Sequence, residues 1–239
     1  MHSISLPSLA IAFIPVLVVI GIIWRWDIGY KASIYAICRM IVQLLLVGYV
    51  LTYIFGTNSY PIVIGILIVM LLTASWISLR TSTLPKKTLM LNAVFSIVVG
   101  GVSVLIIMTQ GVLKIDPWYS PSVMIPLGGM IFANCMNGLS LAAERLESEL
   151  KQGKKYDKAK VIALKTALIP ITNVLLAVGI VSLPGMMTGQ ILSGISPMIA
   201  VRYQVMVLCM LFASSGISVA VFLQSVKRQF SDKKKDIFF

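Results

Sequence analysis

The stretch Glu144–Gly189 decides the fold, and it reads ERLESELKQGKKYDKAKVIALKTALIPITNVLLAVGIVSLPGMMTG. Its first half carries four acidic residues and six lysines, namely Glu144, Glu147, Glu149, Asp157, Lys151, Lys154, Lys155, Lys158, Lys160 and Lys165. Charged side chains are costly in hydrocarbon, so this half is predicted to face water. The apolar run that follows predicts a return into a membrane.

The bulk composition also indicates a membrane protein. Hydrophobic residues make up 58% of the 239-residue chain, charged residues 12%, and the mean hydropathy is +0.96. So few charged residues cannot cover a soluble globule of this size. The net charge of +12 comes from basic residues in short loops and at the C-terminus. That placement is typical of membrane orientation signals and argues against a nucleic-acid partner.

Seven apolar runs are long enough to cross a membrane, since a hydrocarbon core of about 30 Å needs about 20 residues of helix. They do not alternate as barrel strands do. The predicted fold is therefore an all-α, polytopic transmembrane bundle, taken as one domain over residues 1–239. The expected spans are Ile4–Trp24, Ser33–Phe55, Pro61–Leu79, Leu89–Met108, Val123–Ala143, Ala167–Leu183 and Tyr203–Val226.

The basic residues predict the orientation of these spans. One set of span ends collects Arg25, Lys31, Arg80, Lys86, Lys87, the Arg145–Lys165 group, Lys227, Arg228 and Lys233–Lys235. The other set holds only Lys114 and Arg202. Because basic residues concentrate on the cytoplasmic side, the N-terminus is expected outside and the C-terminus inside. An odd number of spans agrees with this result.

Motifs for catalysis are missing from the sequence. No GxxxxGK[ST] phosphate-binding loop occurs, and the only histidine is His2, so no Ser/His/Asp or HExxH arrangement is available. Cys38, Cys135 and Cys209 form no zinc or disulfide pattern. The chain is predicted not to be an enzyme and to hold no cofactor. If the protein transports a solute against its concentration gradient, ATP and Mg²⁺ are expected to bind to a partner subunit.

Polar and thioether side chains recur within the apolar runs and are candidates for a transport pathway. They are Arg39, Gln43, Met130, Asn134, Asn137, Asn173, Met186, Met187, Gln190 and Gln204. Proline and glycine at Pro126–Met130 and Pro184–Gln190 predict broken helices, which often line transport sites. The alternative is structural: amides hydrogen-bond between helices, and small residues let helices pack closely.

The polar segment 144–166 is the candidate coupling segment. Glu147 and Gly153 stand six apart with Leu150 between them, and Glu144 precedes them. This spacing resembles the short helix-turn by which ABC-transporter permeases dock on their ATPase. A loop of about two dozen residues is also long for a compact bundle, and long ordered loops are usually functional. The alternative is a solvated loop with no partner.

The run Gly179–Gly194, with Pro197, Ala200, Tyr203 and Gln204 after it, closely resembles the FetB (YbbM) family of ABC-transporter permeases. Further resemblance lies at Arg39, Gln43, Gly48, Pro126, Gly128, Met130, Asn134 and Asn137. Two positions depart from the family pattern: Ser148 replaces an alanine, and Lys154 and Lys155 replace small residues after Gly153.

The resemblance implies a multi-pass cell-membrane subunit that acts as a homodimer with a separate FetA-like cytosolic ATPase. In bacteria the family is linked to iron export and resistance to oxidative stress, and in plants to aluminium tolerance. The spans carry essentially no carboxylates, so the cargo stays open between an iron chelate, Fe(II) bound by methionine and asparagine, and another solute. An ion-gradient carrier and a non-transporting membrane adaptor remain as alternative functions.

Overall fold

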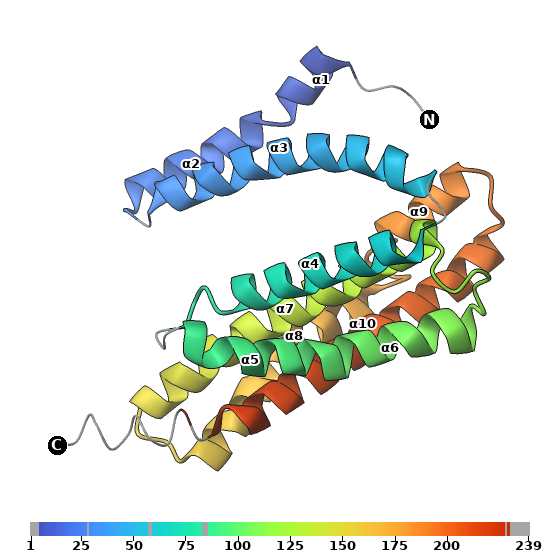
Figure 1. Cartoon of the computed structure of the whole chain (residues 1–239). Helices are drawn as coiled ribbons and strands as arrows, with labels where there is room; N and C mark the ends of the chain where they lie inside the picture. The colour runs from blue at the N-terminus through green and yellow to red at the C-terminus, as the bar shows by residue number, and fades with distance from the viewer. Residues whose placement is uncertain (1–4, 28, 57–58, 83–85, 228, 230–239) are drawn as a thin grey trace. The chain divides into compact units, whose positions relative to one another are not determined.

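The computed structural model describes residues 5–27, 29–56, 59–82, 86–227 and 229 (Figure 1). Within these residues the regular elements are helices, and the one exception is an isolated bridge between Val178 and Ser182. Seven of the described helical segments are long and apolar enough to cross a membrane. The predicted all-helical class and the number of spans are therefore confirmed.

The structure divides into two compact units, Met1–Thr57 and Asn58–Phe239. The prediction of a single domain and the prediction of orientation stay predictions. Four basic residues used to predict the orientation lie outside the described residues, namely Arg228, Lys233, Lys234 and Lys235. His2 lies outside them too.

The first unit is a helical hairpin. Its elements are α1 (Leu6–Ile11), α2 (Ile14–Arg25) and α3 (Tyr30–Phe55). Ser5 caps α1, because its side chain accepts a hydrogen bond from the Ser8 amide at 3.3 Å. Helices α2 and α3 contact each other, and Gly29 takes a φ of 77° at the turn between them. The large apolar side chains of both helices are mostly exposed, as expected of helices that face lipid.

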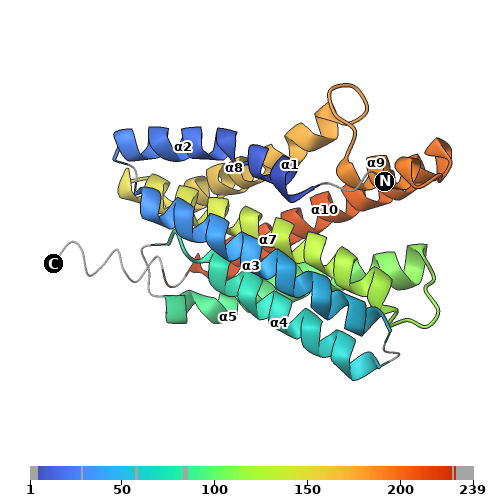
Figure 2. The same ribbon diagram turned by 90° about the horizontal axis from the view of Figure 1, so that it is seen from above.

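The second unit packs its helices around α7. Its elements are α4 (Tyr60–Ser78), α5 (Lys86–Ile97), η1 (Val98–Val102), α6 (Ser103–Ile106), η2 (Ile107–Val112), α7 (Pro121–Lys151), α8 (Tyr156–Ala177), α9 (Gly185–Leu192) and α10 (Pro197–Ser225). Helix α7 contacts α4, α8 and α10 (Figures 1 and 2). Ile131 and Leu139 of α7 are fully buried there, together with Phe222 of α10.

The fourth span is one continuous helical rod from α5 to η2, with wider π-helical turns at η1 and η2. Gly100 and Gly101 lie in η1, and both are buried. A Cβ on Gly100 would lie 2.5 Å from the backbone nitrogen of Ser218 and 2.9 Å from its Cα. Only glycine fits this crossing with α10, because neither backbone atom can rotate away.

The fifth span differs from its predicted bounds. Val123–Ala143 was expected, whereas α7 runs from Pro121 to Lys151 and passes through Pro126 without ending. At 1.5 Å per residue its 31 residues extend about 46 Å, well beyond a hydrocarbon core of about 30 Å. The last turns of α7, which carry the charged residues, therefore project out of the hydrocarbon.

The sixth span begins and ends earlier than predicted. Ala167–Leu183 was expected, but α8 covers Tyr156–Ala177, so its charged first turns are helical too. The chain leaves the helix at Val178, whose ψ of 135° is extended, and turns at Gly179, whose φ is 81°. Residues 178–183, which were expected to close the sixth span, instead form a turn with the bridge between Val178 and Ser182, and the separate short helix α9 begins at Gly185.

Candidate coupling site

The charged segment is a tight helical hairpin. Helix α7 ends at Lys151, and residues 152–155 connect it to α8. Gly153 has a φ of 82°, its amide donates to the Leu150 carbonyl at 3.0 Å, and the Lys154 amide donates to the Glu149 carbonyl at 3.3 Å. These paired bonds around a left-handed glycine form a Schellman cap. The prediction of a loop of about two dozen residues was wrong, because helix-forming residues fill both arms.

Glu147 lies inside this end of the bundle and not on its surface. Its side chain is 6% exposed, and its Oε1 accepts a hydrogen bond from Ser82 Oγ at 2.5 Å. Nearby, Ser140 Oγ donates to the Ser78 carbonyl at 2.8 Å, and Thr81 Oγ1 donates to the Ser140 carbonyl at 3.4 Å. We call these five residues the α4–α7 clasp. It joins the end of α4 to the last turns of α7.

A second acidic residue, Glu149, holds the hairpin closed. Its side chain is fully buried, and its carboxylate pairs with Arg145 Nη2 at 2.5 Å and with Lys154 Nζ. The hydrogen bond from Lys154 holds the pKa of Glu149 below its ordinary value; burial opposes this shift, and the positive charge of Arg145 supports it. The pair with Lys154 bridges the turn, since Lys154 follows Gly153.

The start of α8 is tied to the end of α10. The Tyr156 hydroxyl donates to the Leu223 carbonyl, and Asp157 Oδ1 pairs with Lys160 Nζ at 2.9 Å and with Lys227 Nζ at 3.6 Å. The ammonium of Lys227 also lies 5.9 Å from the centre of the Tyr156 ring. The hairpin therefore contacts α4 on one side, through the α4–α7 clasp, and α10 on the other. A force on its tip would reach both helices.

The pathway candidates are spread over several helices. Arg39 and Gln43 lie together in a pocket on α3 of the first unit. In the second unit, Met130, Asn134 and Asn137 lie on α7, Asn173 on α8, Met186, Met187 and Gln190 on α9, and Gln204 on α10. The side-chain oxygens of Gln190 and Gln204 are buried and have no hydrogen-bond partner within the described residues. The part of the chain that is described holds no group of three His, Cys, Asp or Glu side chains able to bind a metal.

Residues 6–231 match the family model described as "Uncharacterised protein family (UPF0014)". The chain belongs to the UPF0014 family. It is 32% identical to the UPF0014 membrane protein slr1647 of Synechocystis sp. (strain ATCC 27184 / PCC 6803 / Kazusa), with 83% of each chain covered. The predicted family resemblance is confirmed, and the seven spans make this UPF0014 chain a multi-pass membrane protein.

Two further relatives have names that bear on function. The "Probable iron export permease protein FetB" of Escherichia coli (strain K12) is 28% identical, with 99% of this chain and 96% of the relative covered. "Protein ALUMINUM SENSITIVE 3" of Arabidopsis thaliana is 26% identical, with 87% and 81% covered. No solved structure gives a significant match to this UPF0014 chain.

The four predicted coupling residues of this UPF0014 protein differ in exposure. Glu144 and Gly153 are exposed, Leu150 is half-buried and Glu147 is buried. The sequence reading missed the partners of the buried acids, which are Ser82, Arg145 and Lys154. The i,i+4 spacing of Arg145 and Glu149 was a visible signal for one pair. Nothing local marks Ser82, because it lies 65 positions before Glu147.

Asn134 makes an interhelical hydrogen bond, as the structural alternative expects. Its Nδ2 donates to the Leu211 carbonyl of α10 at 2.7 Å. We expect Asn134→Ala to lower the free energy of unfolding by about 0.6–2 kcal/mol, the range of the values measured for such bonds in membranes. Unfolding in a mixed detergent titration measures this change.

Asn137→Ala is the matched control, because Asn137 is exposed one turn further along α7 and makes no hydrogen bond within the described residues. Its stability should stay near that of the unmodified protein. Equal losses in the two variants, or a loss of transport in Asn134→Ala without a loss of stability, would show that the hydrogen bond is not the role of Asn134.

Proposed function

We propose that this UPF0014 protein is the membrane-spanning permease subunit of an ABC transporter. It would act as a homodimer in the cell membrane, with two copies of a separate FetA-like cytosolic ATPase that binds ATP and Mg²⁺. The observation that carries the proposal is the end-to-end similarity to the Escherichia coli protein named as a probable iron export permease. The tight hairpin of α7 and α8 supports the proposal, because a partner subunit could bind such a compact element.

In this proposal the hairpin lies on the cytoplasmic side, as its basic residues suggest. Closure of the ATPase pair would pull on the exposed tip at Gly153 and the neighbouring Lys155. The α4–α7 clasp would pass the movement to α4, and the Tyr156–Leu223 hydrogen bond would pass it to α10. Rigid-body rocking of packed helices is an established way to switch access across a membrane.

The proposed cargo is iron or a related metal, moved outward. The names of the Escherichia coli and Arabidopsis relatives support this choice. Proteoliposomes that hold this chain with its ATPase test the proposal, with metal flux measured in the presence and absence of ATP. Flux driven by an ion gradient without the ATPase would indicate a secondary carrier. No flux with the ATPase present would indicate an adaptor.

Gly153→Ala tests the hairpin itself. A Cβ at this position meets no atom within 4 Å, so the substitution adds no clash, but a φ of 82° is unfavourable for alanine by about 1–2 kcal/mol. We expect the strained turn to fit the ATPase poorly, so that metal flux falls severalfold while ATP hydrolysis continues. The ratio of metal moved to ATP hydrolysed is the measurement.

Gln152→Ala is the control, because Gln152 is exposed, adjacent to Gly153 and has an ordinary φ of −77°. It should leave the ratio unchanged. If Gly153→Ala moves as much metal per ATP hydrolysed as the unmodified protein, the turn does not transmit the movement of the ATPase to the membrane helices.

A further inference from the structure

Arg39 is a cation at membrane depth in a region without acidic residues. It lies in the span Tyr30–Thr52, nine residues after the start of α3 and so about 13 Å along the helix. Between Asp27 and Asp116 the sequence contains no aspartate or glutamate. Asp27 itself lies twelve positions before Arg39, in the turn that precedes α3. A charge kept at such a depth is usually functional and faces a partner.

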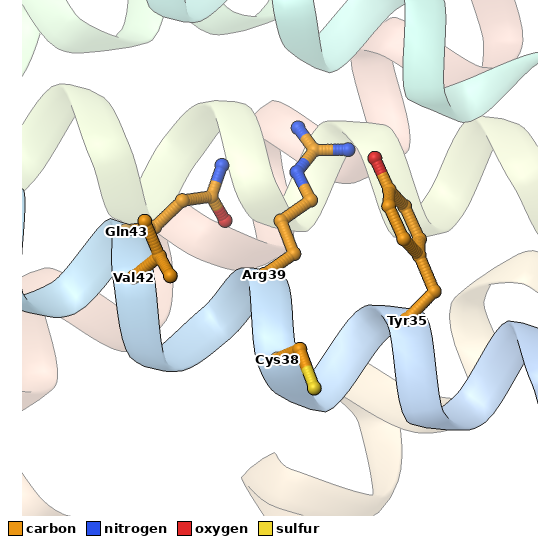
Figure 3. Close-up of a pocket in the computed structure, with 5 residues that line it drawn as sticks. All are labelled: Tyr35, Cys38, Arg39, Val42 and Gln43. Atoms are coloured by element: carbon orange, nitrogen blue, oxygen red, sulfur yellow. The ribbon is translucent and has the colours of Figure 1, made fainter.

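Arg39 belongs to a set of hydrogen-bond donors on one face of α3. Tyr35, Arg39 and Gln43 are each four residues apart, and Figure 3 shows their side chains extending from the same side of the helix. The guanidinium lies between the Tyr35 phenol and the Gln43 amide in this view. Among the described residues of the first unit, none of the three side chains has a hydrogen-bond or ion-pair partner.

These side chains line an open pocket of about 370 Å³, together with Cys38 and Val42. All five lining residues lie on α3 and are exposed, so the pocket is an open hollow on one face of this helix. The polar groups of the pocket are a fixed cation flanked by a hydroxyl and an amide, and none of them is acidic. Such a lining attracts anions and repels a bare metal cation.

We propose that Tyr35, Arg39 and Gln43 bind an oxyanion, and that this oxyanion is a carboxylate of a metal-chelating acid carried as cargo. The inference rests on the proposed transport of a metal and specifies the form in which the metal travels. A planar guanidinium holds a carboxylate by two parallel hydrogen bonds, which Tyr35 and Gln43 would extend to further oxygens. The chelator supplies the metal ligands, so the spans need no acidic residues of their own.

A binding experiment on this chain alone tests the inference independently of the ATPase. The full chain in nanodiscs of zwitterionic lipid is titrated with citrate, iron(III) citrate and Fe²⁺ in a calorimeter. We expect both citrate species to bind and Fe²⁺ alone not to bind. Arg39→Gln should weaken citrate binding about 10- to 100-fold, the loss typical of a charged hydrogen-bonding pair, and Arg39→Lys should weaken it less.

Arg25→Gln is the matched control, since Arg25 is an exposed arginine in the last turn of α2. It should bind citrate as the unmodified protein does. Arg39→Gln removes a charge from an apolar span, so the variant should purify and unfold as the unmodified protein does. A loss of citrate binding in this variant would then not be due to misfolding.

Three results would overturn the inference. The first is equal citrate binding by the unmodified protein and Arg39→Gln, and the second is Fe²⁺ binding as tightly as iron(III) citrate. The third is displacement of citrate by phosphatidylglycerol or inorganic phosphate at lower concentration, which would assign the same donors to a lipid headgroup. Failure of the ATPase to drive flux would refute the proposed function and leave these binding results unchanged.

Discussion

Gly100→Ala is expected to lower the free energy of unfolding by about 1–3 kcal/mol, the usual penalty for overpacking a well-filled core. The new methyl group would lie 2.5 Å from the Ser218 backbone nitrogen and 2.9 Å from its Cα. The substitution can be accommodated only if η1 moves away from α10. That movement would open the buried contacts between the fourth and seventh spans.

A graded series of glycine variants makes this prediction specific. Gly138→Ala meets only side-chain atoms, Ser215 Oγ at 2.7 Å and a Val219 methyl at 3.0 Å, which can rotate, so its loss should be smaller. Gly65→Ala meets nothing within 4 Å and should be neutral or slightly stabilising, because alanine favours a helix. The midpoint of thermal denaturation in detergent ranks the three variants. A loss for Gly65 as large as that for Gly100 would contradict the packing argument.

The number and class of the spans could be predicted because hydropathy depends on composition alone. An apolar run of about 20 residues can be satisfied in lipid only as a helix, whatever it packs against. The prediction was weakest where helices leave the hydrocarbon. The charged residues belong to helices, since α7 continues to Lys151 and α8 begins at Tyr156. A hydropathy pattern cannot distinguish a solvated helix from a solvated loop.

The sequence located the charged hairpin but not the direction in which its side chains face. The spacing of Glu147 and Gly153 identified the hairpin, and the left-handed φ of Gly153 agrees with a turn there. The direction in which Glu147 faces depends on Ser82, a partner distant in sequence and brought close only by the packing of α4 on α7. The need for glycine at position 100 likewise depends on the close approach of α10.

Glu147→Ala is expected to reduce ATP-driven metal flux at least tenfold while the protein still inserts and still binds its ATPase. The buried carboxylate joins α7 to Ser82 at the end of α4, so its removal would let the hairpin move without moving α4. Loss of the hydrogen bond from Ser82 Oγ to this carboxylate also loosens this end of the bundle. Glu147→Gln retains an acceptor oxygen for Ser82 Oγ and should keep part of the flux.

Glu144→Ala separates this role from simple charge loss, since Glu144 is an exposed acid one turn earlier on the same helix. If Glu147 acts through the α4–α7 clasp, Ser82→Ala should reproduce the Glu147→Ala defect in weaker form, and Glu144→Ala should not. If Glu147 instead touched the ATPase directly, Glu147→Ala would weaken co-purification of the ATPase and Ser82→Ala would have no effect. Flux and co-purification measured on the same preparations therefore distinguish transmission within the membrane protein from docking on its surface.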